Sequence, residues 1–192
     1  MSTFTLRRLC VTIVCILFNM PREVNYMTDY RFHIPRWNQL PSIDLYIDQI
    51  IALVDENLSP VLCHQDGFPL TKSMVNNYVK AKLVAAPVNK KYPRISVAMV
   101  IVICLLKSCY STEEIGKLIQ LGLEAEDPQV MYDRFCDALE NALRDVFSGE
   151  IHRKDEKLPE RDKKYLMENF ALSFACKFYV QKTFLQNGQN GA

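Results

Sequence analysis

The sequence predicts an all-α fold with one small β wing. Apolar residues recur at intervals of three and four along most of the chain, which is the spacing of helices buried on one face. Some of these segments open with strong helix-start signals, namely Ser111 three residues before Glu114, and Asp127 directly before Pro128. Residues 84–94 contain two prolines and an asparagine, so this segment is predicted to form a turn or hairpin, the wing.

The length and composition are those of an ordinary globular protein. The chain has 192 residues, 49% hydrophobic and 23% charged, which predicts one compact domain or a small domain with a helical appendage. Its seven cysteines are odd in number and scattered, and no CxxC pair occurs, as is typical of buried thiols in a reducing cytosol. We therefore expect a cytoplasmic protein with no cofactor. We expect no metal site either, because Cys63 and His64 have no second ligand pair nearby in sequence.

Residues 1–34 are read as an N-terminal apolar extension whose role the sequence leaves open. Two arginines precede the apolar run from Leu9 to Phe18, an order that signal peptides share. The run is too short to span a membrane, and no small-residue cleavage site follows it. These features favour a buried helix over an export signal. They equally favour an upstream extension, if translation begins at Met20 or Met27.

The next part of the chain is predicted to hold a turn-rich entry and two helices. Two prolines disfavour helix in residues 35–41. Ser42 is a suitable N-cap for a helix over residues 43–58, where apolar side chains recur at helical spacing. After a break that contains a glycine and a proline, Thr71 caps the second helix, which runs to about residue 82.

The remainder is predicted to be mainly helical. Residues 97–106 are an uninterrupted apolar run, which fits a buried helix and a buried strand equally well. Helices then begin at Ser111 and at Asp127. A last long helix can open at Pro159, and its wide aromatic face must pack on its own domain or on a partner subunit. The predicted divisions are residues 1–34, 35–122 and 123–192.

Positive charge is concentrated in one block of the sequence. Between Gly67 and Thr112 there is no aspartate or glutamate. Such asymmetry concentrates positive potential on one surface, as nucleic-acid-binding proteins require. The basic residues of this block are Lys72, Lys80, Lys82, Lys90, Lys91, Arg94 and Lys107.

The helix predicted over residues 71–82 has one polar face and one apolar face. Lysine, serine and asparagine side chains gather within roughly 140° of arc, with the apolar side chains opposite. Asparagine can pair with adenine, lysine can reach guanine or phosphate, and serine can bond to either. Alone, this face fits an ordinary solvated surface equally well. The acid-free block and the basic turn over residues 89–94 favour binding, because that turn can reach flanking phosphates. The predicted DNA-binding residues are Lys72, Ser73, Asn76, Asn77, Lys80, Lys90, Lys91 and Arg94.

Four segments resemble a bacterial family described as domain of unknown function 1836. They are WNQLPSIDLYIDQ from Trp37, LTKSMVNNYVK from Leu70, PVNKKY from Pro87 and STEEI from Ser111. The order of the elements is also similar to the winged helix-turn-helix of the MerR group. This resemblance implies double-stranded DNA as a partner, a cytoplasmic location and a homodimer joined by C-terminal helices. It names no small-molecule effector, and the apolar first twenty residues depart from the family pattern.

Three functions compete on the sequence alone. We expect a transcriptional regulator that reads the major groove with helix 71–82 and contacts phosphate with wing 84–94. The alternative is a protein–protein interaction module that docks through the aromatic face at 165–184 and binds no nucleic acid. We do not expect an enzyme, because the three histidines lie far apart and no nucleophile elbow, glycine-rich phosphate loop or HExxH motif is present.

Overall fold

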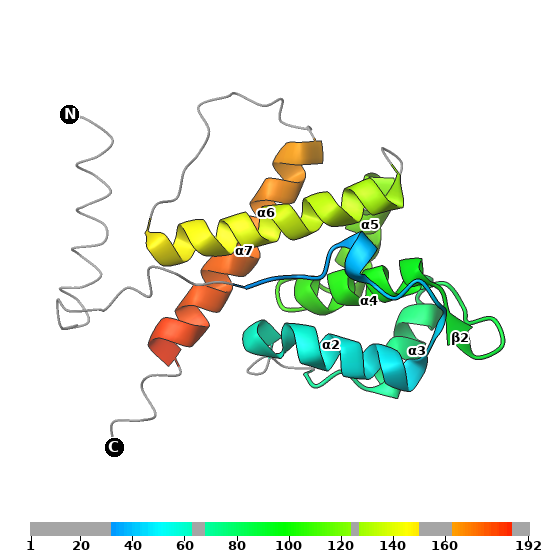
Figure 1. Cartoon of the computed structure of the whole chain (residues 1–192). Helices are drawn as coiled ribbons and strands as arrows, with labels where there is room; N and C mark the ends of the chain where they lie inside the picture. Colours follow the sequence, from blue (N-terminus) through cyan, green and yellow to red (C-terminus); the bar gives the residue numbers. More distant parts are fainter. Residues whose placement is uncertain (1–31, 63–67, 124–126, 150–162, 186–192) are drawn as a thin grey trace, which may run out of the picture.

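The computed structural model describes residues 32–62, 68–123, 127–149 and 163–185, and these are mostly helical with one small two-stranded sheet (Figure 1). The predicted fold class is confirmed at this level. The N-terminal extension before residue 32, the Cys63–His64 pair and Pro159 lie outside the described residues. The elements are η1 (Trp37–Gln39), β1 (Leu45–Tyr46), α2 (Ile47–Leu62), α3 (Lys72–Lys80), β2 (Lys91–Tyr92), α4 (Arg94–Leu106), α5 (Thr112–Leu123), α6 (Pro128–Ser148), α7 (Lys163–Val180) and η2 (Gln181–Leu185).

The first predicted helix begins later than its sequence pattern indicates. Ser42 does not cap it, because Leu45 and Tyr46 form strand β1 and α2 starts only at Ile47. Strand β1 pairs antiparallel with β2, and Leu45 lies opposite Tyr92 in a buried pair. The prediction for residues 43–46 was wrong because their backbone partner lies far along the chain, where local spacing carries no information. A local signal does mark the true start: Gln49 Oε1 accepts a 2.9 Å hydrogen bond from the Tyr46 N–H.

Helix α3 begins at its predicted cap and ends two residues earlier than expected. Thr71 Oγ1 accepts a 3.3 Å hydrogen bond from the Met74 N–H, which confirms the cap. At the other end Lys82 is left-handed, with φ 59°. The Leu83 N–H donates to the Tyr78 carbonyl at 2.9 Å, and the Lys82 N–H donates to the Val79 carbonyl at 3.0 Å. These two bonds form a Schellman motif, in which glycine normally occupies the position of Lys82.

Replacing Lys82 with glycine is therefore expected to stabilise the fold. A left-handed non-glycine residue costs about 1–2 kcal/mol, and the greater chain entropy of glycine in the unfolded state offsets part of that gain. We expect the free energy of unfolding to rise by about 0.5–1 kcal/mol in urea titrations. Lys80→Gly, in the last turn of the same helix, should lower it by a similar amount. Destabilisation by both variants would contradict this account.

The segment predicted as a turn or hairpin is a tight hairpin. Val88 and Lys91 exchange two backbone hydrogen bonds of 2.9 Å each. The two residues between them, Asn89 and Lys90, have φ values of 51° and 64°. Positive φ at both central positions is the mark of a type I′ turn, whose twist matches that of the flanking strands. The hairpin therefore carries Lys90 at its tip.

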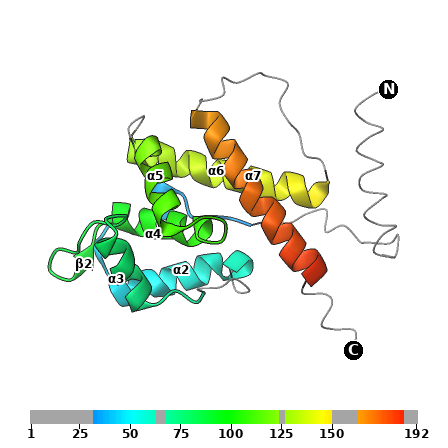
Figure 2. The same ribbon diagram turned by 180° about the vertical axis from the view of Figure 1, so that it is seen from behind.

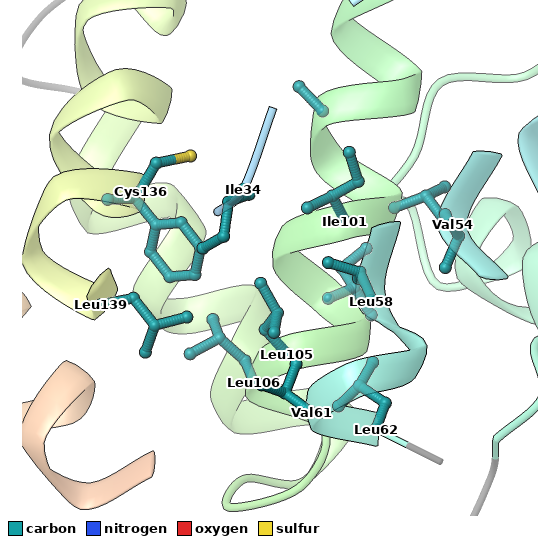
Figure 3. Close-up of a cluster of buried hydrophobic side chains, with 14 of the residues drawn as sticks. Ile34, Val54, Leu58, Val61, Leu62, Ile101, Leu105, Leu106, Cys136 and Leu139 are labelled. Carbon is teal, nitrogen blue, oxygen red and sulfur yellow. The ribbon is translucent and has the colours of Figure 1, made fainter. Parts of the chain in front are cut away.

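The apolar run at residues 97–106 lies in helix α4, which resolves the choice between helix and strand. Most of its side chains are buried, because α4 lies between α2 and α6. Figure 3 shows Ile101 of α4 toward Val54 and Leu58 of α2, whereas Leu106 lies on the side of Leu139 of α6. A helix buried on opposite sides needs no polar face, so its sequence shows no amphipathic period.

The two helices after α4 begin where the sequence predicts. The Ser111 N–H donates to Glu114 Oε2 at 2.7 Å, and the Glu114 N–H donates to Ser111 Oγ at 3.3 Å, which completes the capping box of α5. Asp127 Oδ1 accepts from the Gln129 N–H at 2.8 Å and caps α6. Both starts rest on contacts between residues two or three positions apart, which sequence reading detects well.

Helix α7 packs across α6 (Figure 2). Its aromatic face is buried within the chain. The ring of Phe170 lies 5.8 Å from that of Phe135, and the ring of Phe178 lies 5.8 Å from that of Phe147. This face thus packs largely on its own domain, one of the two alternatives the sequence left open. In the described ranges, no helix is long and apolar enough to cross a membrane. The described cysteines are free thiols, and burial raises the pKa of the Cys136 thiol to about 12.

Candidate nucleic-acid interface

Helix α3 exposes to solvent the polar face that the sequence analysis predicted to bind DNA. Its five predicted DNA-binding residues are all exposed, while Val75 and Tyr78 on the opposite side are buried. The Thr71 cap fixes where the helix starts, and the buried pair fixes its rotation against α2. The exposed residues are Lys72, Ser73, Asn76, Asn77 and Lys80.

One carboxylate reaches this face from another helix. Lys72 Nζ lies 2.7 Å from Asp48 Oδ1 and 2.9 Å from Asp48 Oδ2, and both side chains are largely exposed. Asp48 belongs to the first turn of α2, outside the acid-free block, so no local pattern indicated that it would approach Lys72. An exposed pair of this kind contributes about 0–1 kcal/mol, so a phosphate can displace the carboxylate at little cost.

The basic hairpin, residues 84–94, lies at the same end of the molecule as α3 in both views (Figures 1 and 2). Lys90 at its tip is exposed. Lys91 is half-buried, and its Nζ lies 5.1 Å from the centre of the Tyr46 ring in a cation–π contact. The sheet that joins β1 to β2 thus holds the hairpin next to the start of α2.

The family model for the domain of unknown function DUF1836 matches residues 35–135, just over half of the chain. The chain belongs to this family. No curated protein and no solved structure matches it. The DUF1836 match covers α3, the basic hairpin and all eight predicted DNA-binding residues. It also extends past residue 122 into the first part of α6, so it includes contacts between that helix and the N-terminal residues of the domain.

Arg94 has a different position in the DUF1836 domain from the one its charge suggested. Its Nε donates to the Pro41 carbonyl at 3.1 Å, and its guanidinium carbon lies 5.8 Å from the centre of the Trp37 ring. Both partners belong to residues 32–41, the N-terminal strap. Half-buried and bound to the strap, Arg94 is less available to phosphate than the exposed lysines.

Two exposed residues of the DUF1836 domain were not among the predicted site residues. Lys82 was assigned to the end of a helix, but it lies exposed in the link between α3 and the hairpin. Tyr46, 48% exposed, was assigned to the interior of a helix. Its membership of β1 places it beside Lys91. The charge of Lys82 was visible in the sequence, whereas nothing local marked Tyr46.

No group of histidine, cysteine, aspartate and glutamate within the described ranges is arranged to hold a metal ion. Of the three histidines, only His33 is described. It lies on the strap, with its Nδ1 3.2 Å from Glu140 Oε1 and its Nε2 3.0 Å from Gln39 Oε1. These contacts join the strap to α6 and involve none of the predicted DNA-binding residues.

Proposed function

We propose that this protein is a DNA-binding transcriptional regulator with a winged helix-turn-helix of MerR-like arrangement. The observation that carries the proposal is the exposed polar face of α3, to which α3 itself contributes no carboxylate, beside a type I′ hairpin with a lysine at its tip. In this assignment α2 is the first helix of the motif, α3 is the recognition helix and the basic hairpin is the wing. The order β1, α2, α3, hairpin, α4 supports this assignment.

The residues of α3 would divide between bases and phosphates by their chemistry. Asn76 and Asn77 suit adenine edges in the major groove, and Ser73 can bond to several bases. Lys80, at the end of α3, and Lys90, on the hairpin tip, would contact phosphates and release counterions. Arg94 would instead hold the strap behind the hairpin, because its side chain is bound there.

We also propose a homodimer joined through the C-terminal helices. Apolar side chains occupy every side of α7, and three apolar residues at its end and in the following η2 are exposed: Val180 at 47%, Phe184 at 40% and Leu185 at 64%. A helix that is apolar all round is normally buried on all sides, so these residues suit a second copy. Two copies would present two α3 helices to half-sites about one turn of DNA apart.

Gel shifts of the whole chain on genomic DNA fragments, repeated over a series of salt concentrations, test the central proposal. A regulator should retard many fragments at low salt and only a few at physiological salt, because the phosphate contribution falls with salt and the base contacts remain. If no fragment is retarded even at low salt, the DNA-binding proposal fails. The exposed apolar end of α7 would then favour the protein-interaction module.

Lys90→Ala is expected to lower the salt dependence of DNA binding without changing sequence preference. Loss of one phosphate contact should reduce the slope of log K against log salt by about 0.9. Lys117→Ala removes an equal charge from α5, where Lys117 pairs with Glu113 at 2.7 Å, and should leave the slope unchanged. Gel shifts at four salt concentrations measure both slopes. Equal changes for the two variants would show that only net charge matters.

A further inference from the structure

A second candidate site lies among α4, α5, α6 and α7, away from the α3 face. These helices enclose a cavity of about 100 Å³. Three methionines, Met99, Met131 and Met167, contribute to its wall together with Phe135 and Phe170. Leu121 and Leu166, which also line it, are 46% and 36% exposed, so the cavity reaches the surface beside them.

The wall of this cavity excludes charged and strongly polar ligands. Every described residue that lines it is apolar or aromatic, and Tyr132 alone brings a hydroxyl group. That hydroxyl already donates a 2.8 Å hydrogen bond to the Pro35 carbonyl of the strap. A ligand therefore meets no charge to balance its own, and burial of an unpaired charge or polar group is unfavourable.

The size and lining define the ligand further. A dry apolar cavity of about 150 Å³ in another protein accepts benzene, so a site of this volume suits one ring or a short branched chain. Methionine side chains are flexible and polarisable, so they adapt to such a ligand and favour contact with aromatic rings. We propose that this cavity is a binding site for a small neutral apolar molecule about the size of a single aromatic ring.

The protein contains its own reporter for this site. Trp37 is the sole tryptophan of the sequence, and its ring lies 6.3 Å from that of Tyr132 in an edge-on contact. A molecule in the cavity touches Tyr132 and thereby alters the surroundings of Trp37. Binding is thus measurable without DNA, and the result does not depend on the proposed regulatory function.

Toluene titrated into the whole chain tests the proposal, with benzoate as the charged probe of similar shape. Toluene should change Trp37 emission saturably and raise Tm by about 3–6 °C at roughly ten times its Kd. Benzoate should do neither. Ala98→Leu fills the cavity from α4 and should abolish the toluene response, whereas Ala52→Leu, on the exposed side of α2, should retain it.

Met167→Phe, which fills the cavity from α7, provides a second test if Ala98→Leu does not fold. Retention of the toluene response in a folded filling variant overturns the proposal, and so does an equal response to benzoate. A Tm that stays unchanged across the toluene titration also overturns it.

Discussion

Replacing Asn77 with alanine is expected to weaken binding to a cognate DNA site about 5-fold to 150-fold while hardly changing binding to unrelated DNA. The side chain is exposed in the middle of α3, so its loss should leave the fold intact. In the groove an asparagine amide can donate to and accept from one adenine, and such a bidentate pair contributes about 1–3 kcal/mol of discrimination. The effect should therefore be confined to sequences that carry that adenine.

The measurement needs a cognate site, which genome-wide footprinting of the tagged protein supplies. Competition gel shifts then compare this site with random DNA of equal length. Asn141→Ala is the matched control, because Asn141 is exposed on α6, outside the α3 face and the basic hairpin. An equal loss on cognate and random DNA, or an equal effect of Asn141→Ala, would remove Asn77 from base reading.

The features that the sequence predicted correctly depend on short-range physics. The caps at Thr71, Ser111 and Asp127 each rest on a side chain that bonds a backbone amide two or three residues away. The polar face of α3 follows from helical periodicity, which needs only the residues of that helix. The helical starts and the exposed face of the candidate site could therefore be read without knowledge of tertiary contacts.

The features that the sequence missed depend on partners far away in the chain. Strand β1 exists because β2 supplies its hydrogen bonds, and Asp48 approaches Lys72 because α2 packs against α3. Arg94 belonged to the basic block by composition, but packing placed it on Trp37 and Pro41. Charge counted along the sequence thus locates a basic surface. Tertiary contacts decide which basic side chains of that surface stay exposed to solvent.

The packing of the strap on α6 is the largest structural feature that no local sequence pattern predicted. Helix α6 binds three successive parts of it: Tyr132 Oη donates to the Pro35 carbonyl at 2.8 Å, Asp133 accepts from the Trp37 N–H at 2.7 Å, and Glu140 accepts from the Ile34 N–H at 2.7 Å. The strap in turn contacts Arg94, the last residue of the basic hairpin. It therefore joins the C-terminal helices to the candidate DNA-binding end of the molecule.

Glu140→Gln should detach part of this strap and lower the free energy of unfolding by about 2–4 kcal/mol at pH 7. The Glu140 carboxylate also accepts from both terminal nitrogens of Arg36, at 2.7 and 2.8 Å, and its side chain is only 13% exposed. Glutamine keeps the shape but removes the charge that balances the largely enclosed guanidinium. Asp137→Asn removes a carboxylate from the same arginine, but Asp137 is 62% exposed, so its loss should cost less than about 1 kcal/mol.

The effect of Glu140→Gln should depend on pH in a defined direction. Burial tends to raise the pKa of Glu140, but hydrogen bonds from Arg36 and the Ile34 N–H outweigh it, so the pKa lies below its ordinary value. A lowered folded-state pKa means that the carboxylate stabilises the fold fully above about pH 4.3, the usual unfolded value. That contribution is lost as pH falls through the lowered folded-state pKa, when the carboxyl becomes neutral like glutamine.

Urea unfolding of wild type and Glu140→Gln, followed by Trp37 emission from pH 7 to pH 3, measures this dependence. The difference in free energy of unfolding between the two proteins should narrow as the pH falls below about 4. A difference that stays constant to pH 3 would assign the loss to shape rather than charge. The free energy of unfolding could also fall equally in Asp137→Asn and Glu140→Gln. The enclosed Glu140–Arg36 pair would then stabilise the fold no more than an ordinary surface ion pair.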